Sequence, residues 1–415
     1  MAKRVMILGA GRGQLPLINI CKEMGCETIV ISPEGNYPGF KYADRCYLHN
    51  VKEKEEVLKV AGAEKVEAIL TDQLDAGVLT AAFVSEKLGI PGIGYDVALK
   101  FTDKYVMRKE AQALGVNVPV YFGVGHVQGA CAAAEKTGYP LIMKPVDNGG
   151  SRGVFLINSE AELRENFAAS LQHSLIRTVI VEQYIAGKEY CVDCYTRNHK
   201  VKSLIIGHRD YFNLKNRFIP RATVCTDADS ATGAVERRIL EINERLVTGF
   251  GLNSGITHGE YMYDDKADKI YLVEIAARGG GMFVSSDLIP LGCGINAIRL
   301  LVENALGLNL SNYPVNLKPG ASAYFSFLLP LGRVVRIENA ANIKKLAGVS
   351  KAYFDNLSVG MKIGRVKDKS SRKGPVIVYG KTKQDCYDVI SNVKELLRID
   401  VETPDCGIKG IRWDG

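Results

Sequence analysis

The sequence predicts a protein of several domains, with an α/β part at the N-terminus and an α+β part after it. Its 415 residues exceed the length of an ordinary single domain. Short apolar runs alternate with helical patterns over residues 1–100, which is typical of α/β folds. From residue 101 onward, longer strand pairs occur with fewer helices between them.

Composition restricts the class of partner. The formal net charge of +7 comes from 53 basic and 46 acidic residues spread along the chain. Nucleic-acid-binding proteins usually concentrate such an excess on one element, so we expect small anionic molecules as partners and neither nucleic acid nor a membrane. No apolar run reaches the ~18 residues that span a bilayer. Ten cysteines without a recognisable secretory signal predict a cytoplasmic protein with reduced thiols.

The first hundred residues predict a parallel sheet covered by helices, because strands and helices alternate there. The predicted strands are Arg4–Leu8, Glu27–Ile31 and Ala68–Leu70, and the predicted helices are Leu15–Met24 and Leu79–Leu88. The stretch from Gly89 to Gly94 is rich in glycine and proline and predicts the exit from this domain.

The loop Gly9–Gly13 follows the first strand and precedes a helix, a position suited to an anion. A dinucleotide fingerprint would need a third glycine where Gln14 stands, and a carboxylate after the second strand, where Ile31-Ser32-Pro33 stands. The loop therefore favours a tight turn or a substrate contact. A nicotinamide-dependent oxidoreductase is the weaker alternative.

The segment Pro140–Ile157 reads as strand, glycine-rich loop and strand. Lys144 ends the first strand, and the loop after it contains Gly149, Gly150, Ser151 and Gly153. A lysine and exposed backbone N–H groups at such a loop can hold phosphates, although an ordinary hairpin with a surface lysine would look alike. Lys104, at the start of a predicted helix, is a second candidate cation.

The segment Thr178–Glu189 contains an apolar strand that ends at Glu182 and breaks toward Gly187 before a new strand begins near Glu189. Backbone groups exposed at such a break could pair with the edge of an adenine, and Glu189 could accept hydrogen bonds from ribose hydroxyls. Two surface glutamates flanking a turn are the alternative interpretation.

The strands Gly255–Tyr263 and Lys269–Ala276, joined by a polar turn, carry the most informative pattern. Side-chain alternation places His258 with Glu260 on one face, and Glu274 with Arg278 on one face. A hairpin could bring Glu260 and Glu274 side by side, where two carboxylates repel unless a cation lies between them. Such a pair suits Mg²⁺, which takes its remaining ligands from phosphate and water.

These motifs, in this order, resemble the ATP-grasp superfamily and its carboxylate–amine ligases, such as biotin carboxylase, glycinamide ribonucleotide synthetase and amino-acid ligases. The resemblance covers nearly the whole chain. It implies a pre-ATP-grasp α/β domain at residues 1–100, a two-lobed ATP-grasp domain at 101–310 with its small lobe near 115–185, and a C-terminal subdomain at 311–415.

The resemblance also implies roles for matching residues. Those roles are ATP phosphate binding by Lys104 and Lys144, closure by the loop Gly149, Gly150, Ser151 and Gly153, adenine contact by Glu182, Gln183 and Ile185, ribose contact by Glu189, Mg²⁺ binding by Glu260 and Glu274, and catalysis by Arg278 together with Lys144. The implied cofactors are ATP and Mg²⁺, which Mn²⁺ could replace. By analogy alone, we expect a homodimer.

One departure from the family pattern concerns the metal. Family members often read Glu-Ile-Asn-Pro-Arg where this chain reads Glu274-Ile-Ala276-Ala-Arg278, so the usual asparagine ligand is absent. Gly279–Gly281 and Ser285–Asp287 are expected to shape the acceptor pocket. Further candidate substrate contacts are His208, Arg209, Arg217 and Arg221.

The implied reaction joins a carboxylate to an amine through an acyl phosphate and releases ADP and phosphate. A bicarbonate-activating carboxylase is the nearest alternative, because the same kind of site can form carboxyphosphate. An ATP-binding module without turnover is another, given Ala276. The sequence does not distinguish between classes of acid or amine.

Overall fold

A computed structural model of the chain describes residues 2–149, 152–214, 218–281, 283–308, 316–355, 357–405 and 407–414. The chain forms two compact units. Unit 1 comprises residues 1–204, 232–286 and 295–316, and unit 2 comprises residues 205–231, 287–294 and 317–415. The predicted three-domain division stays a prediction, and we describe each unit by itself.

Unit 1 begins with a parallel sheet in the order β3-β2-β1-β4. Its strands are β1 (Arg4–Leu8), β2 (Glu27–Ser32), β3 (Arg45–Leu48) and β4 (Ala68–Leu70), and its helices are α1 (Leu15–Glu23), α2 (Lys54–Glu64), α3 (Val78–Leu88) and α4 (Tyr95–Lys100). Side chains of β1 alternate between two cores, because neighbours in a strand point to opposite faces. Val5 and Ile7 join the core that contains α1, whereas Met6 and Leu8 join the core that contains α2. The predicted parallel sheet is confirmed.

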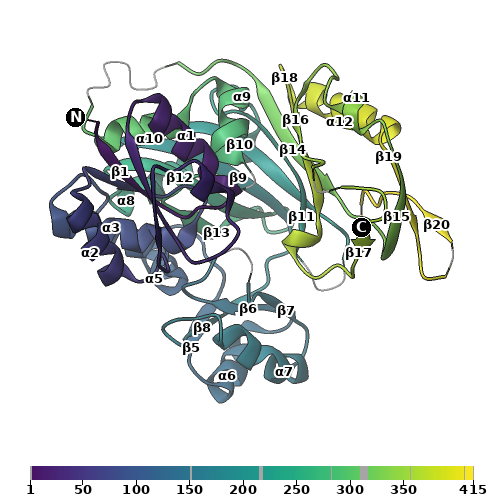
Figure 1. Ribbon diagram of the computed structural model, residues 1–415. Coiled ribbons are helices and arrows are strands. Elements are labelled where there is room, and N and C mark those ends of the chain that lie inside the picture. The colour runs from purple at the N-terminus through teal and green to yellow at the C-terminus, as the bar shows by residue number, and fades with distance from the viewer. Residues whose placement is uncertain are drawn as a thin grey trace. The chain divides into compact units, whose positions relative to one another are not determined.

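A small lobe follows, built on an antiparallel sheet in the order β5-β8-β6-β7. Its strands are β5 (Tyr121–Val124), β6 (Leu141–Pro145), β7 (Phe155–Ile157) and β8 (Val179–Gln183), and its helices are α6 (Val127–Thr137) and α7 (Glu160–Leu171). Both helices pack on this sheet (Figure 1), where Ala130, Leu163 and Phe167 join the strand residues in one core. The Ser159 side chain caps α7 by accepting from the Glu162 backbone N–H.

The remainder of unit 1 contains antiparallel strands in the order β13-β12-β9. Their bounds are β9 (Lys188–Arg197), β12 (Ser254–Asp264) and β13 (Lys269–Ala276). The helices of this part are α5 (Lys104–Ala113), α8 (Ala234–Gly249) and α10 (Ala297–Ala305). The predicted hairpin strands therefore exist: β12 extends one residue beyond the predicted Gly255–Tyr263 at each end, and β13 has the predicted bounds. Strand β10 (Lys200–Tyr211) leads out of unit 1 along the chain.

Unit 2 has two antiparallel sheets. The first contains β11 (Pro220–Asp227), β14 (Ala321–Phe327), β18 (Lys373–Gly380) and β16 (Val349–Ala352) in that order, and the second contains β17 (Lys362–Ile363), β15 (Gly332–Glu338), β19 (Arg398–Glu402) and β20 (Ile408–Lys409) in that order. Its helices are α9 (Ile289–Cys293), α11 (Ala340–Ile343) and α12 (Lys383–Leu396). Phe325, Phe327, Val376 and Val393 belong to one apolar core that joins α12 to the strands.

Among the described residues, no single helix is long and apolar enough to cross a bilayer; only the consecutive helical segments 284–293 and 297–305, taken together, pass by length and composition.

Candidate active site

Two carboxylates face each other on the β12–β13 hairpin. Glu260 and Glu274 are directly opposed in the strand register, as the sequence predicted. A β-bulge follows Glu260, so that Tyr261 pairs with Leu272 and the ladder passes over Val273. Directly opposed like charges destabilise a sheet unless something compensates them. Nowhere in the described ranges do three or more His, Cys, Asp or Glu side chains form a group that could hold a metal ion. The metal role of Glu260 and Glu274 stays a prediction.

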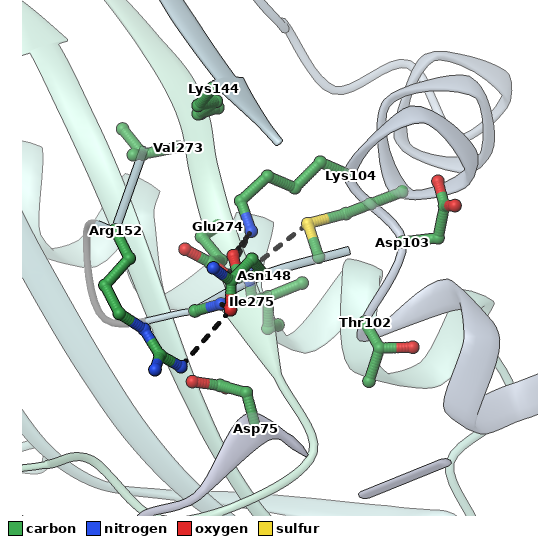
Figure 2. Close-up of polar contacts among 12 residues, drawn as sticks. Asp75, Thr102, Asp103, Lys104, Lys144, Asn148, Arg152, Val273, Glu274 and Ile275 are labelled. Carbon is green, nitrogen blue, oxygen red and sulfur yellow. Dashed lines mark hydrogen bonds and ion pairs between the residues drawn. The ribbon is translucent and has the colours of Figure 1, made fainter. Parts of the chain in front are cut away.

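Lys104 compensates one of these carboxylates. It begins α5 directly after the capping residue Asp103, and it is only 4% exposed. Its Nζ lies 3.0 Å from Glu274 Oε1 and donates to the Asn148 carbonyl at 2.9 Å (Figure 2). Burial acts to lower the pKa of Lys104, but the carboxylates of Glu274 and Asp75 outweigh it, so the pKa is raised. Lys104 therefore remains a cation beside the hairpin.

A buried ion cluster joins α5 to the small lobe. Glu182 Oε1 accepts from Arg108 Nε at 2.7 Å, and Glu182 Oε2 lies 2.6 Å from Lys144 Nζ. Burial alone would raise the pKa of Glu182, but Arg108 and Lys144 lower it to about 2. Burial lowers the pKa of Lys144, helped by the neighbouring cations Arg108 and Lys104 and opposed by Glu182. Glu182 therefore holds the Lys144 side chain in place. Phosphate binding by Lys144 stays a prediction.

Arg108 was missed by sequence reasoning. Its side chain is fully buried, and its Nη2 donates to the Val273 carbonyl at 2.6 Å, next to Glu274. One guanidinium therefore ties β8 of the small lobe to β13 of the hairpin. Its position one helical turn after Lys104, at i+4, was the available signal, because residues four apart share a helix face.

Both oxygens of the Glu182 carboxylate contact cations, Arg108 and Lys144. An adenine bound here would therefore have to contact the backbone after Glu182. β8 ends at Gln183, and residues 184–186 lie outside any strand before β9 begins. The predicted break in the strand is therefore present. Glu189 is 7% exposed on β9, where its register partner is Met262. The roles of Gln183, Ile185 and Glu189 stay predictions.

The glycine loop joins β6 to β7, as predicted. Gly150 and Ser151 lie outside the described residues. Gly149 packs so closely on Asp75 that an added Cβ would overlap the Asp75 carboxylate, whereas Gly153 has a positive φ of 74° that favours glycine. Arg152 Nη2 donates to Asn148 Oδ1 at 3.3 Å (Figure 2). Lys104 and Arg152 thus both contact Asn148 at the start of the loop.

Arg278 contacts the N-terminal part of the chain. Its Nε and Nη2 each lie 2.7 Å from Asp75 Oδ1, and Asp75 begins the short helix η3 (Asp75–Gly77) after β4. Burial acts to lower the pKa of Arg278, but Asp75, Glu274 and Glu260 raise it. Asp75 therefore holds Arg278 beside the carboxylate pair. No sequence pattern predicts this contact, because more than two hundred residues separate the partners.

A second contact joins the segment after β4 to the loop after Arg278. The fully buried Asp72 accepts from Ser285 Oγ at 2.6 Å and from the Gly279 N–H at 3.0 Å. Burial raises the pKa of Asp72 despite these hydrogen bonds. The Gln14 side chain donates to the Asp72 carbonyl and accepts from the Gly11 N–H. Gln14, which stands where a dinucleotide fingerprint would have its third glycine, therefore links the Gly9–Gly13 loop to the segment after β4.

His258 lies beside Glu260 but faces an unpredicted partner. Its Nδ1 lies 3.0 Å from Asp193 Oδ1 and Oδ2, and its Nε2 lies 3.4 Å from Glu260 Oε1. Burial acts to lower the pKa of His258, but Asp193 and Glu260 raise it to about 10. A protonated His258 thus partly balances Glu260.

The Lys104–Glu274 ion pair borders a cavity of about 440 Å³. Its walls come from the segment after β4, the start of α2, the turn before α5 and the glycine loop. Asp75, Lys104, Arg152 and Glu274 all line it, and Figure 2 shows these four side chains close to Asn148. A cavity of this size accommodates a small organic molecule.

The weaker substrate candidates belong to unit 2. The His208 ring contacts the Tyr387 hydroxyl at 2.8 Å, and Arg221 forms ion pairs with Asp210 and Asp414. Arg209 also has an interaction partner, and Arg217 lies outside the described residues. Asp287, which was expected near the acceptor pocket, pairs with Lys351 at 2.5 Å.

Comparison with known proteins gives one family match within this region. Residues 137–287 match the family model described as the ATP-grasp domain. The L-arginine-specific L-amino acid ligase of Bacillus subtilis is 25% identical over 301 residues, which cover 71% of this chain and 70% of that protein.

Solved structures share the architecture over nearly the whole chain. The crystal structure of an L-amino acid ligase from Bacillus licheniformis has a TM-score of 0.79 at 22% identity and covers 96% of this chain and 98% of its own. The biotin carboxylase domain of the Hydrogenobacter thermophilus 2-oxoglutarate carboxylase, in complex with MgADP, ADP and bicarbonate, has a TM-score of 0.72 at 19% identity and covers 99% and 92%. At such identities these likenesses show a shared fold.

Proposed function

We propose that this chain, in which residues 137–287 match the ATP-grasp domain, is an ATP- and Mg²⁺-dependent ligase of the carboxylate–amine type. In the proposed reaction, a carboxylate is phosphorylated by ATP to an acyl phosphate, and an amine then displaces phosphate to form an amide. ADP and phosphate are released. The observation that supports this best is the direct pairing of Glu260 with Glu274, with Lys104 3.0 Å from Glu274.

The donor set suits Mg²⁺. Two opposed carboxylates supply oxygen ligands of the kind that Mg²⁺ prefers, and nucleotide phosphates and water complete its usual shell. Ala276 is 2% exposed and supplies no oxygen from its side chain, so Glu260 and Glu274 would hold the ion with the nucleotide. When bound, Mg²⁺ would neutralise charge on the β- and γ-phosphates.

The side chains of this site perform the remaining tasks. Lys104 and Lys144 place positive charge at the end of β6 and the start of α5, where the phosphates are proposed to bind. The substrate carboxylate attacks the γ-phosphorus, the bond to ADP breaks, and the acyl phosphate forms. Arg278, held by Asp75 and by the hydrogen bond from its Nη1 to the Gly279 carbonyl, would place its guanidinium charge beside the developing negative charge. The amine nitrogen then attacks the acyl carbon, and phosphate leaves.

The test is ADP release with Mg²⁺ and ATP across a panel of amino acids, dicarboxylates, bicarbonate and paired amines. Release should depend on an acid and an amine together, and Glu274→Gln should reduce it by at least about a hundredfold while leaving the melting temperature near that of the wild type. A Glu274→Gln rate close to wild type would refute the metal assignment.

The same panel separates the alternatives. Release that depends on bicarbonate alone would indicate carboxyphosphate chemistry. Tight Mg-ATP binding without release on any substrate would indicate a non-catalytic module. A cytoplasmic location, which the cysteine content of the sequence suggested, is part of the proposal.

A further inference from the structure

The 440 Å³ cavity shares only a few residues with the proposed nucleotide site. Of the residues assigned to ATP and metal, it is lined by Lys104, Gly149 and Glu274. Lys144, Glu182, Gln183, Glu189 and Glu260 are absent from its walls. Because only the phosphate-binding end of the nucleotide site borders this cavity, it is suited to the second molecule of the reaction, the acid that attacks the γ-phosphorus.

Most of the acidic groups in the cavity wall already have partners. Glu274 pairs with Lys104, and Asp75 pairs with Arg278. Asp103 caps α5 by accepting from the Tyr105 and Val106 N–H groups. Asp147 Oδ2 accepts from the Leu175 N–H at 2.8 Å, whereas its Oδ1 has no hydrogen-bond partner. One carboxylate oxygen therefore remains available.

Three basic side chains of the wall have no carboxylate within ion-pair distance among the described residues: Lys52, Lys54 and Arg152. Lys52 and Lys54 flank the N-terminus of α2, where a positive charge opposes the helix dipole. The N-cap residue Glu53 makes no side-chain capping bond. Lys54 Nζ instead lies over the rings of Phe83 and Tyr95, at 4.8 and 5.1 Å from their centroids.

Like charges also approach each other in this wall. Burial lowers the pKa of Lys52, and the nearby Arg152 lowers it further, while Asp147 opposes them. Lys52 is half-buried and Arg152 is exposed. A half-buried lysine with a like charge nearby, at a helix start that favours anions, is stabilised by a bound negative group. Leu74, Leu79, Leu99 and Phe101 provide an apolar surface in the same cavity.

We propose that this cavity binds the acid substrate, and that this acid is dianionic: one carboxylate lies beside Glu274 and Lys104, an apolar body packs on the leucines, and a second anionic group lies beside Lys52 and Lys54. This inference rests on the proposed ligase function for the fate of the first carboxylate. The inference of a second anionic group rests only on the residues that line the cavity.

The experiment is a calorimetric titration of the whole chain, with Mg²⁺ and a non-hydrolysable ATP analogue, using succinate, glutarate and adipate against butyrate, valerate and hexanoate. We expect at least one dicarboxylate to bind at least tenfold more tightly than the monocarboxylate of equal length. The double variant Lys52→Gln/Lys54→Gln should remove this preference. Lys59→Gln, on the same helix but outside the cavity, is the matched control and should retain it.

Lys52→Gln alone keeps the Lys54 ring contacts and should still reduce the preference, which separates charge loss from misfolding of the double variant. Equal binding of mono- and dicarboxylates by the wild type, equal weakening of both by the double variant, or no binding by either class would overturn the inference. A dicarboxylate preference without ADP release from any acid–amine pair would support the cavity assignment and refute the ligase function. Turnover on monocarboxylates alone would support the ligase function and refute the cavity assignment.

Discussion

Glu182→Gln tests whether the buried ion cluster is a structural element of this fold. The substitution keeps the size of the side chain but removes the charge that Arg108 and Lys144 share. Arg108 is fully buried and Lys144 is 7% exposed, so both cations would remain in a poorly solvated site without a counter-ion. Breaking a buried ion pair in this way typically costs about 3–5 kcal/mol.

The pKa of Glu182 gives a second estimate of how much its charge contributes to the stability of the fold. A fall from 4.5 to about 2 on folding corresponds to roughly 3 kcal/mol of stability for the charged form. Since the folded pKa is the lower one, this stability is present above pH 4.5 and is lost as the pH falls toward 2. The variant should therefore differ most from the wild type at neutral pH, and the difference should shrink below about pH 4.5.

Urea denaturation followed by circular dichroism at pH 7, 5 and 4 measures both effects. Glu160→Gln is the matched control, because Glu160 pairs with Arg164 at 2.6 Å on the exposed face of α7, where water screens the pair. A free-energy loss below about 1 kcal/mol for Glu182→Gln, or a loss no larger than that of the control, would refute the reasoning.

Three further predictions concern the site. Lys144→Ala should weaken Mg-ATP binding by at least tenfold in equilibrium dialysis, because its ammonium is the cation at the end of β6, and unchanged affinity would remove it from the nucleotide site. Asp75→Asn should lower kcat by roughly tenfold to a hundredfold with little change in the KM for ATP, because Arg278 loses its anchor; a rise in KM alone would contradict this role. Gly149→Ala should resemble Asp75→Asn in steady-state kinetics, because its Cβ would displace the Asp75 carboxylate, whereas Gly364→Ala, at a glycine with open space around it and no positive φ, should leave kcat unchanged.

The sequence predicted those parts of the molecule that depend on local pattern. Alternation along β12 and β13 predicted the two carboxylates, and the glycine-rich segment predicted the β6–β7 hairpin, because neighbours in sequence determine both. Some strand and helix ends were displaced, as with α3, which begins at Val78 instead of Leu79. Caps and tertiary contacts decide such ends.

Long-range partners could not be predicted in the same way. Asp75 and Asp193 come from segments with no motif of their own, and Arg108 had only its spacing from Lys104. Each acquires its role through a residue far along the chain. Glu182 shows the same limit: its strand was predicted, but the two cations that occupy its carboxylate come from α5 and β6.

The Asp75–Arg278 ion pair limits which fragments of the chain can be expressed with a complete site. The stretch that matches the ATP-grasp family model, residues 137–287, includes Arg278 but neither Asp75 nor Lys104. An expression fragment cut to that stretch would lack the carboxylate that orients its arginine and the ammonium that balances Glu274. Activity assays on such a fragment would measure an incomplete centre, so library screening and directed evolution of this protein should retain residues 1–136 as well.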